Sequence, residues 1–317
     1  MAAKAYAGFV DDLRRCEQLG VRLYNFHPGN TNGAPRPEAI GRIAAALNRS
    51  HRETSSVVTV LENMAGSGNT VGSSWEDLRD IIALVEDKGR VGVCIDTCHT
   101  FAAGYDLRLP EAFKATMEQF DKVVGLKYLK ALHCTSLLFL LPLFPFVLST
   151  LLSVVLSVWL RLSPAQPMPR ATKTLTQAVN DSKAPLSSNR DLHANIGTGF
   201  LGLRAFHNVV NYPPFAGLPM VLETPIDRKG ADGKSVEDRQ VWADEIKLLE
   251  GLVGADPEGD EFKAREAELA EQGRGERAKF QDQADRKAAK GVKAAAKTAA
   301  KAVKDAVKGA GKKGKAK

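Results

Sequence analysis

Five short apolar segments, each followed by a residue that can bind a metal ion or exchange a proton, constrain the fold of this chain most strongly. They are rich in β-branched residues and alternate with amphipathic stretches of helical period. Such alternation predicts βαβ units and a parallel sheet. The expected strands are Val21–Phe26, Val57–Leu61, Val91–Ile95, Tyr128–Leu132 and Pro219–Leu222. The expected helices include Phe9–Leu19, Glu38–Leu47, Trp75–Val85, Glu111–Val123 and Leu203–Val210.

The residues that follow these strands favour a closed β/α barrel over an open parallel sheet. In order along the chain they are His27, Glu62, Asp96, His133 and Glu223. In a β/α barrel the carboxyl ends of all strands meet on one face, whereas in an open sheet they are spread along a line. A single such residue is usually a capping or hydrogen-bonding group, but five in succession indicate a shared site. We therefore expect a barrel of the TIM type.

Two further clusters extend this set of side chains. His99 lies one helical turn beyond Asp96, and Asp191 and His193 are two residues apart, on one side of an extended segment. Mixed imidazole and carboxylate ligands suit zinc or manganese better than calcium. Eight ligands are too many for one tetrahedral ion, so a bridging carboxylate would let two or three ions share them around a phosphodiester.

The remaining histidines and cysteines receive plainer interpretations. His51 and His207 are expected on the surface of helices. Cys94 and Cys98 flank Asp96 and leave a cysteine site open as an alternative, although a free cysteine is usually a small buried apolar residue. Four scattered cysteines in 317 residues are too few for a disulfide scaffold and fit a reducing compartment. No signal peptide is expected at the start of the chain.

The net charge of +7 is a property of the C-terminal end. From residue 286 onward there are twelve Lys or Arg residues and one acid, whereas the preceding 285 residues carry a net charge of −4. Lysines recur every three or four residues among alanines, which places them on one face of a helix and suits DNA phosphates or nuclear import. A solvated extension is the alternative. The candidate DNA-binding residues are Lys290, Lys293, Lys297, Lys301, Lys304 and Lys308.

Composition divides the chain into four regions. Residues 1–133 and 179–253 carry the βα pattern, and residues 254–317 form a charged tail that is disordered or helical. Residues 134–178 interrupt the pattern with a charge-free apolar run at 137–160, which is long enough to span a bilayer. We interpret this insert as translated non-coding sequence, with a genuine isoform or a membrane anchor as alternatives, and we expect no true membrane association.

At these residues the sequence resembles the endonuclease IV family of apurinic/apyrimidinic endonucleases. The resemblance covers about residues 7–133 and 179–252, and its longest string runs from Val91 to Asp106 through Cys94-Ile95-Asp96-Thr97-Cys98-His99. Other matching strings are Asn25-Phe26-His27-Pro28-Gly29, Leu61-Glu62-Asn63, Asn180-Asp181-Ser182-Lys183, Asp191-Leu192-His193 and Leu222-Glu223-Thr224-Pro225.

The resemblance implies a barrel with three zinc ions that hydrolyses the phosphodiester 5′ to an abasic site in duplex DNA and leaves a 3′-hydroxyl. Glu62 and Glu223 are the expected catalytic carboxylates. The implied ligands are His27 and Glu62 for the first ion, Glu62, Asp96, His133 and Glu223 for the second, and His99, Asp191 and His193 for the third. We further expect a monomer that acts in base excision repair, and the basic tail indicates the nucleus, with a mitochondrial pool left open.

The chain departs from the family in two respects. A family barrel has eight strands, and about five of eight βα units are found here, so Met1 is expected to be an internal start and one histidine ligand of the first ion has no counterpart. The insert separates His133 from Asn180. Two alternatives therefore stand beside the endonuclease: a metal-dependent sugar isomerase on the same scaffold, and an inactive fragment that binds DNA only through its tail.

Overall fold

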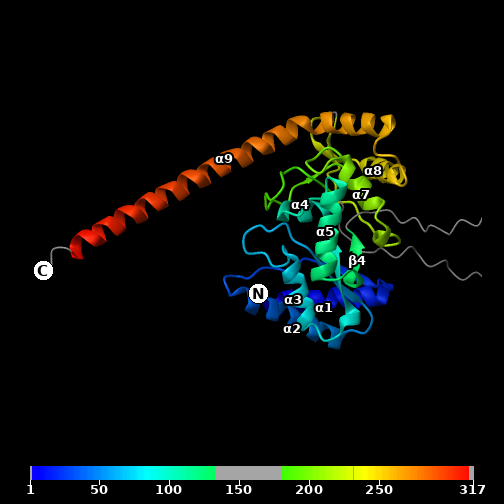
Figure 1. Cartoon of the computed structure of the whole chain (residues 1–317). Helices are drawn as coiled ribbons and strands as arrows, with labels where there is room; N and C mark the ends of the chain where they lie inside the picture. The colour runs from blue at the N-terminus through cyan, green and yellow to red at the C-terminus, as the bar shows by residue number, and fades with distance from the viewer. Residues whose placement is uncertain (1, 133–179, 231, 314–317) are drawn as a thin grey trace, which may run out of the picture.

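The computed structural model describes residues 2–132, 180–230 and 232–313 (Figure 1). His133 and the interpretation of the insert at 134–178 lie outside the described residues. Within them, no helix combines the length and the apolar character needed to cross a membrane. The four proposed regional boundaries stay predictions.

A parallel sheet of four strands lies at the centre of the body, as the sequence predicts. The strands are hydrogen-bonded in chain order, and the register pairs Phe26 with Leu61 and Glu62 with Cys94. The carboxyl ends of neighbouring strands therefore share one edge. The strands are β1 (Leu23–Phe26), β2 (Val58–Glu62), β3 (Val91–Ile95) and β4 (Leu129–Leu132).

The fifth expected strand, Pro219–Leu222, is wrong as a strand. Within the described residues this segment forms isolated bridges: Met220 pairs parallel with Leu132, whose backbone N–H donates to the Pro219 carbonyl oxygen at 3.0 Å, and Leu222 also lies in a bridge. The segment thus runs parallel beside the end of β4 as isolated bridges and not as a regular strand.

Helices follow the strands as the periodicity predicts, with two additions, α4 and α8, that the expected set lacked. The Asp96 carboxylate caps α4 by accepting the His99 backbone N–H at 2.6 Å, and Gly104 ends this short helix in the left-handed conformation at φ 110°. The helices are α1 (Ala2–Leu19), α2 (Arg36–Glu53), α3 (Trp75–Leu84), α4 (Thr97–Ala103), α5 (Pro110–Val123), α7 (Leu203–Val210), α8 (Gln240–Leu252) and α9 (Asp260–Lys313).

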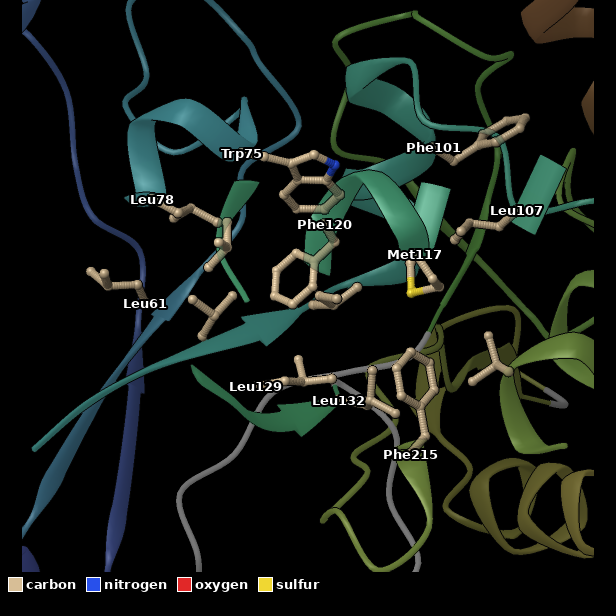
Figure 2. Packing of buried hydrophobic residues seen from close by; sticks show 14 of the residues in the cluster. Leu61, Trp75, Leu78, Phe101, Leu107, Met117, Phe120, Leu129, Leu132 and Phe215 are labelled. Atoms are coloured by element: carbon tan, nitrogen blue, oxygen red, sulfur yellow. The ribbon is translucent and has the colours of Figure 1, made fainter. Parts of the chain in front are cut away.

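Large apolar side chains pack between the sheet and the helices. Figure 2 shows Trp75 and Phe120 close together and Phe215 beside Leu132. The rings of Trp75 and Phe120 meet edge to face, with centroids 5.2 Å apart. A separate cluster of smaller buried side chains contains Val60, Cys94 and Ala131 from three neighbouring strands. The apolar core thereby fixes the strands whose ends carry the predicted ligands.

A buried carboxylate organises the segment that follows the insert. Asp181 lies in the short strand β5 (Asp181–Ser182), which pairs antiparallel with β6 (His193–Ala194). Its side chain accepts four backbone N–H groups at 2.7–3.1 Å, from Ser182, Gly199, Leu201 and Gly202. Complete burial raises the pKa of Asp181 to about 6, although these four donors oppose that rise. The carboxylate thus holds residues 181–202 as one compact loop.

Gly199 should be essential for this loop. A Cβ at this position would collide with the Asp181 carboxylate and would lie 2.5 Å from the Ser182 carbonyl oxygen. We expect Gly199→Ala to lower the free energy of unfolding by about 2–4 kcal/mol, measured by urea denaturation. Gly251→Ala, at a position in α8 with open space around it, should leave stability unchanged or raise it slightly. Equal stability of the two variants would contradict the role given to Asp181.

His51 corrects one sequence expectation. It is 8% exposed, and its Nε2 lies 2.9 Å from Thr59 Oγ1 in β2, so it is a core residue and not a surface one. Burial, followed by the neighbouring Arg90 guanidinium, lowers the pKa of His51 to about 4. His207 is half-buried, and its Nε2 lies 2.9 Å from the Ala255 carbonyl oxygen. Helical periodicity alone did not reveal these contacts because each partner lies in another segment of the fold.

The depressed pKa of His51 predicts acid sensitivity. Between its ordinary value of 6.5 and about 4, the unfolded chain binds the His51 proton more readily than the folded chain does. Its contribution to stability is therefore complete above pH 6.5 and is lost as the pH falls toward 4. We expect the stability difference between the wild type and His51→Gln to shrink by on the order of 2 kcal/mol over this range. Unfolding at a series of pH values measures it, and a constant difference would contradict the shift.

Candidate metal centre

Strand ends and a helix cap bring the predicted ligands to one edge of the sheet. His27 follows β1, Glu62 ends β2, and Asp96 follows β3. The N-cap bond from His99 to Asp96 sets the first turn of α4. Glu62, Asp96 and His99 are buried, whereas the His27 side chain is 41% exposed. The sequence therefore places a buried cluster of acids and imidazoles beneath a more open histidine.

Glu62 lies between two imidazoles. Its Oε1 is 3.3 Å from His27 Nε2 and 3.3 Å from His99 Nδ1. Its other oxygen, Oε2, accepts a hydrogen bond from Asn25 Nδ2 at 2.6 Å. The three side chains of His27, Glu62 and His99 form one group whose ligand atoms lie within 4.8 Å of one another. This position makes Glu62 the residue best placed to bridge two ions.

Asp191 joins His99 to His193 on the other side of the cluster. Asp191 Oδ2 lies 3.1 Å from His99 Nε2, and Oδ1 lies 2.9 Å from His193 Nε2. The described residues hold two further candidate groups. One combines Asp96 with His99 and His193, and the other combines Cys98 with Asp191 and His193. The Cys98 thiol donates to the Leu192 carbonyl oxygen at 3.6 Å and is fully buried.

The orientation of His99 fits a bound cation. Its Nδ1 lies 2.8 Å from the Asn63 carbonyl oxygen, which can only accept, so Nδ1 carries the proton in the neutral ring. Nε2 then presents a lone pair toward Asp191. Within the described ranges, the buried Nε2 atoms of His99 and His193 make no geometrically acceptable hydrogen bond. Imidazole and carboxylate lone pairs that converge in this way fit a divalent metal ion.

The electrostatics of the cluster point in the same direction. Burial disfavours a charged His99, yet Asp96, Asp191 and Glu62 raise its pKa well above the ordinary range. The imidazoles of His193 and His99 hold the pKa of Asp191 far below its usual value. Asp191 therefore keeps its negative charge and attracts cations, either protons on the imidazoles or a metal that replaces them.

The structure brings most of the predicted ligands together. Seven are described, and six of them form the three groups. Glu223 lies at the periphery, 55% exposed, with Oε2 3.8 Å from His193 Nδ1. His133 lies outside the described residues. The six grouped ligands are His27, Glu62, Asp96, His99, Asp191 and His193.

Three asparagines support the ligands, and no role was assigned to them from the sequence. Asn25 donates to Glu62, and the Asn63 side-chain oxygen accepts the Asp96 backbone N–H at 2.7 Å. Asn180 accepts the Glu223 backbone N–H at 3.2 Å through Oδ1. Each asparagine lies within one of the matching strings, directly beside or two residues from a ligand or a buried acid, which was the available signal.

Comparisons with known proteins agree with this arrangement. Residues 1–139 match a family model described as a xylose isomerase-like TIM barrel. Apurinic-apyrimidinic endonuclease 1 of Schizosaccharomyces pombe is 39% identical over 274 residues, which are 86% of this chain and 64% of that protein. The Saccharomyces cerevisiae protein of the same name is 41% identical over 251 residues, 79% of this chain and 53% of that protein. The chain thus spans less than two thirds of either yeast relative.

A bacterial relative is covered more fully. The probable endonuclease 4 of Campylobacter curvus is 37% identical over 250 residues, which are 78% of this chain and 68% of that protein. Among solved structures, endonuclease IV from Thermus thermophilus superimposes with a TM-score of 0.52 and 24% identity over 79% of this chain and 68% of that chain. The structural likeness confirms the TIM-barrel type of fold.

His99 belongs to two of the three candidate groups, so removal of its imidazole should lower the metal content of the protein strongly. After dialysis against zinc and removal of excess metal, we expect His99→Ala to retain at least one zinc ion fewer per chain than the wild type. His207→Ala removes an imidazole away from the cluster and serves as the matched control. Unchanged zinc content in His99→Ala, measured by atomic emission, would exclude this histidine as a ligand.

Proposed function

This chain belongs to the endonuclease 4 family of apurinic-apyrimidinic endonucleases, and we propose that it hydrolyses the DNA phosphodiester 5′ to an abasic site. The product would carry a 3′-hydroxyl. The observation that supports this most strongly is the set of six ligands that converge at one edge of the sheet, with Glu62 between His27 and His99.

We propose zinc as the metal because the ligands combine imidazoles with carboxylates. His27 and Glu62 would hold one ion, Glu62 and Asp96 a second, and His99, Asp191 and His193 a third. Divalent ions bound there would lower the pKa of a water molecule and offset the charge that develops on a phosphate. The neutral tautomer of His99, fixed by the Asn63 carbonyl, agrees with the third assignment because it leaves Nε2 as the ligand atom.

The protein's own residues prepare the site before any substrate binds. Asn25 and Asn63 hold the carboxylate of Glu62 and the backbone of Asp96, so neither ligand has to be ordered during the reaction. Glu62, Asn63 and Asp96 are themselves fully buried, which limits competition from water. Such preorganisation keeps the negative charges close together, which is tolerable only when cations or protons lie between them.

The exposed members of the site favour a polymer substrate. The side chains of His27, Asp191 and Glu223 are 41%, 46% and 55% exposed, so one side of the cluster is open. A sugar isomerase would need a closed pocket of sugar size, whereas an open rim admits a DNA backbone. Exposing an abasic nucleotide costs less than exposing a normal one, because no base has to be unstacked.

A nuclear location is supported by the lysine-rich end of the chain. Two of the relatives are yeast proteins named apurinic-apyrimidinic endonuclease 1, and the lysine-rich end of this chain suits nuclear import. We propose a role in base excision repair in the nucleus.

A cleavage assay tests the proposed activity. The full chain loaded with zinc is incubated with a labelled duplex that contains one abasic-site analogue. We expect a single cut on the 5′ side, and we expect a polymerase to extend the product because its end is a 3′-hydroxyl. Glu62→Gln keeps the shape of the side chain but removes its charge, and should reduce the cleavage rate at least 100-fold, about 3 kcal/mol of barrier.

Glu86→Gln is the matched control, since the Glu86 side chain forms an exposed ion pair with Arg52 away from the cluster, and it should cleave at the wild-type rate. Conversion of an aldose to a ketose without any cleavage would favour the isomerase instead. Absence of both reactions in a zinc-loaded, folded chain would support the inactive fragment.

A further inference from the structure

We propose that α9 is a directional DNA-binding arm: its first half docks beside the metal centre, and its lysine-rich half binds phosphates on one flank of the lesion. The inference rests on the proposed function for the identity of the lesion. It goes beyond a basic tail, because the docked first half of α9 would fix the direction in which the lysine-rich half extends.

The first half of α9 packs tightly on the loop that carries Asp191 and His193. Leu269 is buried against Gly197, whose own φ of 78° allows the loop to turn at this contact. Arg277 Nη1 donates to the Thr198 carbonyl oxygen at 2.6 Å. Gly273 faces the same carbonyl so closely that no Cβ could be accommodated. The helix therefore cannot shift along this loop without losing several contacts.

A second set of contacts lies next to the candidate ligands. The Arg190 guanidinium lies over the Phe280 ring, 5.2 Å from its centroid, and its Nη1 donates to Gln283 Oε1 at 3.1 Å. Lys183 Nζ forms an ion pair with Glu276 Oε1 at 3.2 Å. Arg190 directly precedes Asp191 in the chain. The base of the arm is thus anchored one residue from a candidate metal ligand.

Beyond these contacts α9 extends away from the rest of the protein (Figure 1), and its sequence becomes strongly basic. Figure 1 shows the C-terminal part of α9 extending far from the remainder of the protein. Lys287, Lys290, Lys293 and Lys297 are exposed, and no acidic residue occurs between Asp285 and Asp305. Their spacing of three or four residues places them on one face. The helix continues to Lys313 and carries Lys301, Lys304 and Lys308 at the same spacing.

A polyanion is the partner that this arm fits. Like charges three and four residues apart repel one another, and phosphates relieve that repulsion with release of counterions. A second copy of the lysine face would increase the repulsion. Outside the lysine face, residues 287–294 offer only alanines, one glycine and Val292, which is 71% exposed and too small to anchor the helix in a lipid surface. From residue 286 to 313 the arm is about 40 Å long, or about 12 base pairs.

The first experiment measures the charge contribution on undamaged DNA. The variant Lys287→Gln, Lys290→Gln, Lys293→Gln, Lys297→Gln is compared with the wild type in binding to an undamaged duplex over a range of salt concentrations. We expect the slope of log K against log salt to fall in magnitude by about 3–4 and binding at low salt to weaken at least 10-fold. Four body lysines changed to Gln (Lys4, Lys114, Lys122 and Lys127) give the control, which should match the wild type.

The second experiment measures direction. Two duplexes carry one abasic-site analogue with a flank of about 15 base pairs, longer than the arm, on one side and a short flank on the other. The wild type should bind one of them at least 10-fold more tightly. Arg190→Ala with Phe280→Ala removes one part of the contacts at the base of α9 and should reduce this preference, while the salt dependence on undamaged DNA remains because the lysines are kept.

The outcomes separate the inference from the proposed function. An unchanged salt slope in the lysine variant overturns the arm, as does equal binding to the two flanked duplexes by the wild type. Lysine-dependent binding to anionic vesicles or to a second copy, without an effect on DNA, overturns it as well. If the wild type neither cleaves nor prefers abasic DNA, yet the lysine variant loses its salt slope on undamaged DNA, the proposed function fails and the arm's DNA contact stands.

Discussion

The contact of the buried Glu62 carboxylate with two imidazoles is the interaction on which the rest of the site depends. Glu62 ends β2 at the centre of the sheet, fully buried, with His27 and His99 each 3.3 Å from the same oxygen. A buried carboxylate is stable only when a positive charge or strong donors compensate for the loss of hydration. The parallel register, the cap of α4 and the Asn25 hydrogen bond all serve to keep this charge and its partners in place.

Sequence patterns predicted the framework of the sheet and most of the imidazoles and carboxylates that meet at its edge. Strands such as Val91–Ile95 are continuous apolar runs, and the parallel topology then brings Glu62 and Asp96 to a common edge. Contacts between distant segments were not readable in this way. The Asn63 carbonyl that sets the tautomer of His99, the four N–H groups around Asp181 and the pairing of His51 with Thr59 arise from tertiary packing.

Charge is divided unevenly between the body of the protein and its C-terminal helix. The first 285 residues carry a net charge of −4 and concentrate carboxylates at the candidate metal centre, whereas the lysines gather on the outer half of α9. Acids in the body would repel a phosphate backbone unless cations offset them locally. Metal ions at the rim and lysines on the arm would supply positive charge at two separate places, one for the reacting phosphate and one for its neighbours.

Anomalous scattering at the zinc absorption edge, from crystals of the full chain grown with zinc, tests the central claim most directly. The account predicts metal peaks at the edge of the sheet, with one bonded to His99 Nε2, Asp191 and His193 at about 2.0–2.2 Å and another beside Glu62. Crystals in which zinc is found only at other surface residues, while these imidazoles and carboxylates keep their direct contacts, would contradict it.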